Sequence, residues 1–290
     1  MRGGSSKPST PPPSPLFSEP WRKIPWGDKD TELQYVKNYK PERDDVQHLR
    51  VLLYGPAGAG KSSFISSVDS VLQGRITTRA LADANSGPCP SRTYKTYKIK
   101  KGRPGNFYPF VFNDTLGLQM EEDGGVHLDD IKLAMKGHMR DGYTFNPASK
   151  LSDDSKYYNA HPTKNDKVHV LMCVVPADKA ALLTEADVRK MKDIRRAASD
   201  LGIPQLAVIT KIDLACQEIQ KDLKNVYKSK YLKDKMQKFS DFAGIPVNCI
   251  FPVKNYHEEI DMKDDVDSLI LSVLRRIIDF GEDFINDMET

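Results

Sequence analysis

Residues 55–62 read GPAGAGKS and fit the phosphate-loop pattern G-x-x-x-x-G-K-[ST] at every specified position. Glycines let a backbone curl so that successive amides point at phosphate oxygens, and the N-terminus of the following helix adds partial positive charge. A glycine-rich turn capped by serines is the alternative, but the apolar run before the motif and the helical stretch after it favour a phosphate loop. The expected phosphate contacts are Ala57, Gly58, Ala59, Gly60, Lys61, Ser62 and Ser63.

Two oxygen donors in this region would suit Mg²⁺. The Ser62 hydroxyl would bind the ion directly, while Lys61 reaches the β- and γ-phosphates. The strand predicted at 107–113 ends in the sequence DTLG, so that Asp114 comes at its carboxyl end. A carboxylate in that place holds Mg²⁺, usually through water, and Gly117 would let a backbone amide approach the γ-phosphate. An ordinary strand-ending turn is the alternative reading of DTLG.

A third polar segment, Thr210-Lys211-Ile212-Asp213, follows the apolar strand predicted at 205–210. Guanine presents its N1–H and its exocyclic amine side by side, and one carboxylate can accept both hydrogen bonds. Adenine has no such pair of donors. Asp213 is therefore suited to select guanine, with the alkyl stem of Lys211 lying over the base. The three motifs in this order predict GTP or GDP with Mg²⁺ as the ligands, and disfavour ATP.

Strands and helices alternate after residue 48, which is typical of a mostly parallel sheet flanked by helices. A short glycine-containing link at 101–105 predicts an antiparallel hairpin between the second and third strands. The polar insert at 140–166 suggests no chemistry. The expected strands are 48–54, 94–101, 107–113, 168–175, 205–210 and 247–252, and the expected helices are 61–72, 128–139, 185–200, 230–240 and 264–287.

The chain divides into three parts by composition. Residues 1–19 are rich in Gly, Ser and Pro and are expected to be a disordered tail. Residues 20–45 hold both tryptophans and a helix at 29–39. Because exposed tryptophans are costly, this arm is expected to pack back on the domain, with a self-association surface as the alternative. Residues 46–290 are expected to form one α/β domain, a P-loop NTPase G domain with a six-stranded sheet.

Composition limits the partners and the compartment. The net charge is +3, from 43 basic and 40 acidic residues, which favours neither a nucleic-acid nor a membrane partner. Four scattered cysteines show no metal-ligand spacing, and Cys173 and Cys249 are expected to be buried thiols in strands, as in a reducing compartment. No apolar run has membrane-spanning length. The prediction is a cytoplasmic protein, with its six histidines at surface or capping positions.

Together these motifs resemble a GTPase G domain and, more closely, the interferon-induced protein 44 and 44-like family. The resemblance covers about residues 19–285. The segments that carry it are EPWRK at 19–23, LLYGP at 52–56 running into GAGKSSF at 58–64, NDTLGL at 113–118, and FPVKNY at 251–256.

The resemblance implies a cytosolic, interferon-inducible, guanine-nucleotide-binding protein of innate immunity with sheet order 2-3-1-4-5-6. Longer members carry a TLDc domain, so the chain looks like a short form without it. By the same analogy, Val253 and Lys254 lie where backbone groups contact guanine O6, with Val253 as the expected donor. A plain strand end is the alternative at that position.

Hydrolysis is a separate question from binding. Efficient small GTPases orient the attacking water with a glutamine after the D-x-x-G glycine, and this chain has Leu118 there. Hydrolysis is therefore expected to be slow, or to depend on a partner or a second copy docked on the G-domain face. The flexible segment 74–93 supplies candidates for these roles: Arg75, Arg79 and Arg92 as arginines acting in trans or as solvated charges, and Thr77 or Thr78 as the γ-phosphate sensor. The alternative function is a non-catalytic GTP- or GDP-binding scaffold in antiviral signalling.

Overall fold

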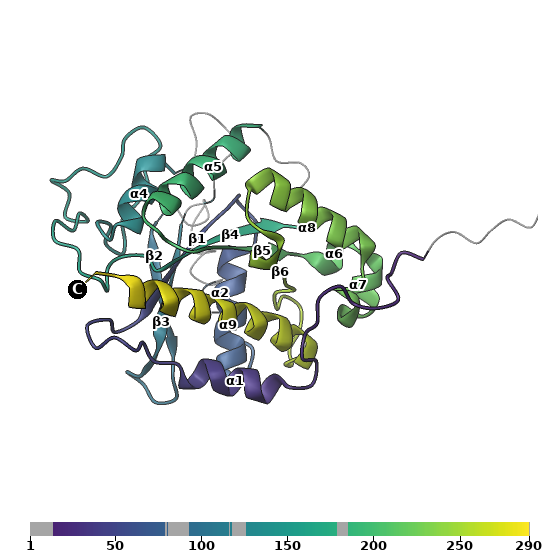
Figure 1. Cartoon of the computed structure of the whole chain (residues 1–290). Coiled ribbons are helices and arrows are strands. Elements are labelled where there is room, and N and C mark those ends of the chain that lie inside the picture. The colour runs from purple at the N-terminus through teal and green to yellow at the C-terminus, as the bar shows by residue number, and fades with distance from the viewer. Residues whose placement is uncertain are drawn as a thin grey trace, which may run out of the picture.

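In the computed structural model, six strands among the described residues form one sheet in the order β2-β3-β1-β4-β5-β6 (Figure 1). The structure describes residues 14–78, 80, 93–115, 117, 126–178 and 185–289. Only β2 runs antiparallel to its neighbour β3, and the other neighbouring pairs are parallel. The strands are β1 (Leu49–Tyr54), β2 (Lys95–Lys100), β3 (Phe107–Asp114), β4 (Val170–Pro176), β5 (Gln205–Thr210) and β6 (Ile250–Pro252). The predicted strand order and the predicted hairpin are both confirmed.

Helices cover both faces of this sheet. Helices α2 and α9 pack on one face with α1 outside them, and α4, α5 and α8 lie on the opposite face (Figure 1). The helices are α1 (Lys29–Asn38), α2 (Lys61–Gln73), α4 (Leu128–Met135), α5 (Glu185–Asp200), α6 (Ile212–Ala215), α7 (Gln217–Lys221), α8 (Lys230–Ala243) and α9 (Asp264–Asp287), with 3-10 turns η1 (Leu223–Asn225) and η2 (Val247–Cys249).

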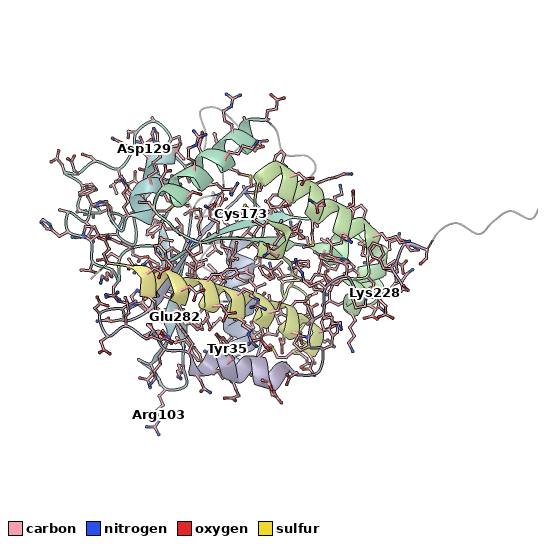
Figure 2. The ribbon with its side chains drawn as sticks, viewed as in Figure 1. Tyr35, Arg103, Asp129, Cys173, Lys228 and Glu282 are labelled. Atoms are coloured by element: carbon pink, nitrogen blue, oxygen red, sulfur yellow. The ribbon has the colours of Figure 1, made fainter. Side chains whose placement is uncertain are left out.

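The apolar sequence of the central strands explains their place in the sheet. All seven residues of β4 are buried, as expected for a parallel strand covered on both faces. Cys173 lies at its centre, inside the sheet (Figure 2), and is a fully buried thiol as predicted. On one face, α9 approaches β1 so closely that a Cβ on Gly281 would lie 2.2 Å from Leu49 Cδ1. A larger residue at Gly281 would therefore displace the Leu49 side chain in the core.

The segment predicted as a strand at 247–252 is only partly extended. Residues 247–249 form the 3-10 turn η2, and the strand β6 starts at Ile250. The amide of Cys249 donates to the Pro246 carbonyl and closes this turn. Cys249 is consequently half-buried, so the prediction of a buried thiol in a strand is wrong for this residue.

One histidine is not at the surface or at a cap. His127 caps α4 through its ring nitrogen, as expected, but His169 is fully buried. Its Nδ1 accepts the Arg50 amide at 2.9 Å, and its Nε2 donates to the Lys164 carbonyl at 2.9 Å. Burial lowers the pKa of His169 to about 4, so the ring is neutral and ties the end of the polar insert to β1.

The N-terminal segment lies against the domain. Trp21 and Trp26 are half-buried against the core, and the ring of Trp21 meets Tyr227 edge-on at 5.0 Å. Helix α1 packs along α9, where Figure 2 labels Tyr35 and Glu282. Of the tail predicted at 1–19, residues 1–13 lie outside the described residues. Within the described ranges, no helix combines the length and the apolar composition required to cross a bilayer.

Candidate functional site

The phosphate-loop motif forms the turn between β1 and α2. Gly55 and Gly60 have φ angles of +145° and +92°, which residues with a Cβ rarely adopt. A Cβ on Gly55 would lie 2.0 Å from the carbonyl oxygen of Val174 on the neighbouring strand. The Gly60 carbonyl accepts the Phe64 amide and so starts the hydrogen bonding of α2. The motif therefore has the strand–loop–helix setting that its sequence predicted, with the helix N-terminus at the end of the loop.

Lys61 folds back over the loop that precedes it. Its Nζ donates to the carbonyls of Gly55 at 3.2 Å and Pro56 at 3.3 Å, and the residue is 7% exposed. Burial lowers the pKa of Lys61, and the nearby Asp114 carboxylate opposes that change. Neutral carbonyls do not cancel the charge of the ammonium group, so it can still bind an anion. Phosphate oxygens are the natural counter-charge at this place.

The two predicted Mg²⁺ ligands lie side by side. Parallel pairing aligns Leu53 of β1 with Asp114 of β3, which brings the carboxylate to the start of α2. Ser62 Oγ donates to Asp114 Oδ2 at 2.6 Å. The other oxygen, Asp114 Oδ1, is buried without a hydrogen-bond partner among the described residues. Burial raises the pKa of this carboxyl, with Lys61 and Ser62 acting in the other direction. A hydroxyl and a carboxylate with a free oxygen fit the oxygen-ligand preference of Mg²⁺.

Gly117 approaches the phosphate loop from β3. A Cβ at this position would lie 2.5 Å from Ala57 Cα and 2.6 Å from the Ala57 nitrogen. Only glycine fits here, so the segment after Asp114 lies against the loop as the D-x-x-G hypothesis requires. Ala57 and Gly58 are exposed in the loop, as expected for residues that contact a phosphate. The Ala59 amide, which was also predicted to contact phosphate, instead donates to the Pro56 carbonyl at 3.2 Å, and Ser63 follows in the first turn of α2.

The third motif lies at the end of β5 and contacts the same loop. Thr210 is fully buried and its Oγ1 donates to the Ala59 carbonyl at 2.6 Å. Lys211 follows in the left-handed conformation, with φ of +56°, and its carbonyl accepts the Leu214 amide at the start of α6. Asp213 on α6 has a side chain that is 21% exposed. Thr210 therefore contacts the phosphate loop, while Asp213 remains open to a ligand.

Val253 does not have the free amide that was expected of it. Its N–H donates to the Ile209 carbonyl of β5 at 2.8 Å, and its side chain is fully buried. Pairing with β5 thus uses the group that was predicted to contact guanine O6, and this expectation is corrected. Lys254, in contrast, lies beside Asp213, the residue predicted to contact the base. Its Nζ is 3.8 Å from Asp213 Oδ2 and 2.7 Å from Glu259 Oε1.

Two residues of this region were not predicted from the sequence. Asn255 Nδ2 donates to the Gly60 carbonyl at 3.2 Å, and its Oδ1 is buried without a partner among the described residues. Glu259 accepts the amides of His257 and Glu258 and binds Lys254. Asn255 belongs to the PVKNY segment, but nothing in its local sequence indicated a contact with residues nearly two hundred positions earlier.

The expected switch residues are only partly described. Leu118, Arg79 and Arg92 lie outside the described residues. Thr77 lies against α2, where its amide donates to Ser70 Oγ and its hydroxyl donates to the Ser66 carbonyl. It therefore contacts the helix beyond Ser62 and not the Ser62–Asp114 pair. Thr78 and Arg75 are exposed.

The sheet order, the loop between β1 and α2, and the motifs at the ends of β3 and β5 define the G-domain fold of P-loop NTPases. No family model matches the chain. Interferon-induced protein 44 is 34% identical over 256 residues in both Homo sapiens and Mus musculus, covering 88% of this chain and 57% and 60% of those proteins. Human interferon-induced protein 44-like is 31% identical over 253 residues, which are 87% of this chain and 56% of that protein.

Over most of its length, the chain is thus a homologue of interferon-induced proteins 44 and 44-like, and the predicted resemblance is confirmed. The chain spans somewhat more than half the length of these curated relatives. Among solved structures, Toc33 from Arabidopsis thaliana in complex with GDP and Mg²⁺ has a TM-score of 0.48 at 14% identity, covering 88% of this chain and 92% of that one. Elongation factor SelB from Methanococcus maripaludis has a TM-score of 0.40 at 11% identity and covers 86% of this chain and 36% of that one.

Proposed function

We propose that the chain binds GTP or GDP together with Mg²⁺. The observation that supports this most directly is the Ser62–Asp114 pair, whose buried carboxylate oxygen has no partner among the described residues. A buried carboxylate oxygen without a partner destabilises the fold unless a cation or a water molecule binds it. A bound Mg²⁺ would neutralise charge on the β- and γ-phosphate oxygens. Lys61 and the amides of the loop would hold the phosphates, and Asp213 would accept the guanine donors.

The biological setting is part of the same proposal. The relatives carry the name interferon-induced, and we infer that this chain acts in the interferon-induced, innate response as a cytoplasmic protein. Residues 46–290 would be its G domain, and residues 20–45 an arm packed on that domain. The balanced net charge and the homology support this setting.

Replacing Lys61 with alanine tests the phosphate loop. The variant should bind GDP at least about tenfold more weakly, because it loses a charge-assisted phosphate contact of roughly 1.5–3 kcal/mol. Isothermal titration of wild type and variant with GDP in Mg²⁺ measures this difference. Lys238→Ala is the matched control, since that side chain is 71% exposed and forms an ion pair with Asp234 on the same helix. Unchanged GDP affinity in Lys61→Ala would contradict the loop assignment.

Hydrolysis distinguishes two forms of the function. With Leu118 in place of the usual glutamine, the isolated chain should hydrolyse GTP slowly, and a second copy would have to supply the missing group. A single-turnover rate that rises with protein concentration supports a switch that works through such a dimer. Absence of phosphate release at every concentration instead supports a non-catalytic scaffold. Lys61→Ala, which lacks the cation expected to contact the β- and γ-phosphates, gives the background rate for both cases.

A further inference from the structure

Arg22 lies between the N-terminal segment and the strand that leads to the predicted base site. Its guanidinium donates to the Val247 carbonyl at 2.6 Å and to the Ile250 carbonyl at 2.7 Å. The same group lies over three aromatic rings, those of Trp21 at 5.0 Å, Tyr227 at 5.1 Å and Phe251 at 5.5 Å. It also donates to the Tyr227 hydroxyl at 3.2 Å. A planar, permanently charged group that makes three directed bonds fixes the geometry of the turn before β6.

A second contact from the same segment holds the residues that follow β6. Lys29, at the start of α1, donates to Asp267 Oδ2 of α9 at 3.3 Å. The other oxygen, Asp267 Oδ1, accepts the Tyr256 hydroxyl at 2.6 Å, and Asp267 is only 3% exposed. The amide of Tyr256 in turn donates to Ser67 Oγ on α2. Lys29 and Asp267 therefore form a hydrogen-bonded chain that holds the backbone at residue 256.

The segment between these two contacts, β6 and residues 253–256, leads to the predicted nucleotide site. Strand β6 has three residues and, among the described residues, it pairs with β5 alone, so few ladder hydrogen bonds hold it. It leads directly to Lys254, which lies beside Asp213, and to Asn255, which donates to the Gly60 carbonyl of the phosphate loop. A shift of this segment would move both contacts together.

We propose that residues 20–38 of the N-terminal arm are a positioning element for guanine recognition. The arm braces β6 and residues 253–256 through Arg22 on one side and through Lys29 and Asp267 on the other. It touches neither the phosphate loop nor Asp213 with these two side chains. Through Lys254 the arm acts on the predicted base site, and through Asn255 it also reaches the phosphate loop, so we expect the larger effect on the base. This inference rests on the proposed guanine-nucleotide function.

The test uses the full chain with Arg22→Gln, measured by displacement of a fluorescent GDP analogue with GDP and with ADP. Losing both carbonyl bonds should weaken GDP binding by roughly tenfold. ADP affinity does not depend on the contacts beside Asp213 and should fall less, so the ratio of GDP to ADP affinity falls. Arg22→Lys, which keeps the charge over the rings but not the planar fork, should restore part of that ratio.

Arg43→Gln is the matched control. Arg43 also donates to a backbone carbonyl, that of Met288 at 2.6 Å, but this contact lies at the C-terminal end of α9. Its variant should keep both affinities at wild-type values, and thermal unfolding of each variant measures any general loss of stability. An unchanged GDP-to-ADP ratio in Arg22→Gln, or an equal fall in Arg43→Gln, overturns the arm proposal. If the wild type itself binds no guanine nucleotide, the proposed function fails first, and the arm proposal fails with it.

Discussion

Replacing Asp213 with asparagine is expected to change the preferred base from guanine to xanthine. The carboxylate can only accept hydrogen bonds, which matches the N1–H and exocyclic amine of guanine. An asparagine side chain has one acceptor and one donor, and xanthine carries an oxygen where guanine carries its amine. Two charge-assisted bonds at about 1.5 kcal/mol each correspond to a loss of GDP affinity of about 100-fold. Xanthosine diphosphate should gain affinity in the same variant.

Competition between GDP and xanthosine diphosphate against a fluorescent nucleotide measures this exchange. Lys254 adds a complication, because its Nζ lies 3.8 Å from Asp213 and would face a neutral amide in the variant. Glu259, at 2.7 Å, remains as its counter-charge, so the local charge balance is not lost. Asp234→Asn, at a side chain that is 55% exposed on α8, is the matched control and should leave base preference unchanged. Retained guanine selectivity in Asp213→Asn would mean that another residue recognises the base.

Replacing Gly55 with alanine is expected to destabilise the whole domain. The new Cβ would lie 2.0 Å from the Val174 carbonyl oxygen and 3.0 Å from its carbon, which is backbone of a central strand. That strand cannot withdraw, since β4 pairs with both β1 and β5. The φ of +145° adds strain of about 1–3 kcal/mol, and the clash raises the expected loss above about 4 kcal/mol. Many domains have little more stability than this to lose.

Urea denaturation followed by circular dichroism measures this loss, with nucleotide absent so that binding does not contribute. Gly74→Ala is the control, because Gly74 has a φ of +67° and its Cβ would meet nothing within 4 Å. That variant should lose only about 1 kcal/mol, the cost of the left-handed conformation itself. Equal losses in the two variants would show that the close approach of Gly55 to β4 does not exist in solution.

The sequence alone determined the parts of this protein that depend on neighbouring residues. The phosphate loop uses consecutive amides, so a run of eight residues is enough to specify it. Helix α9, from Asp264 to Asp287, has the bounds that its apolar periodicity predicted. The short glycine link predicted the β2–β3 hairpin for the same reason, because a hairpin is a local structure.

Only the tertiary structure decided which distant groups meet. The Val253 amide donates to the Ile209 carbonyl, and Asn255 Nδ2 donates to the Gly60 carbonyl. The partners of each bond are far apart in the sequence, so no spacing pattern predicts them. His169, which comes just before β4, is buried against an amide of β1 and a carbonyl of the polar insert, and neither group belongs to β4. A hydrogen bond depends on the positions of two groups in space, and packing brings together groups that are far apart in the chain. Motifs built from adjacent residues could therefore be predicted, while contacts between such motifs required the fold.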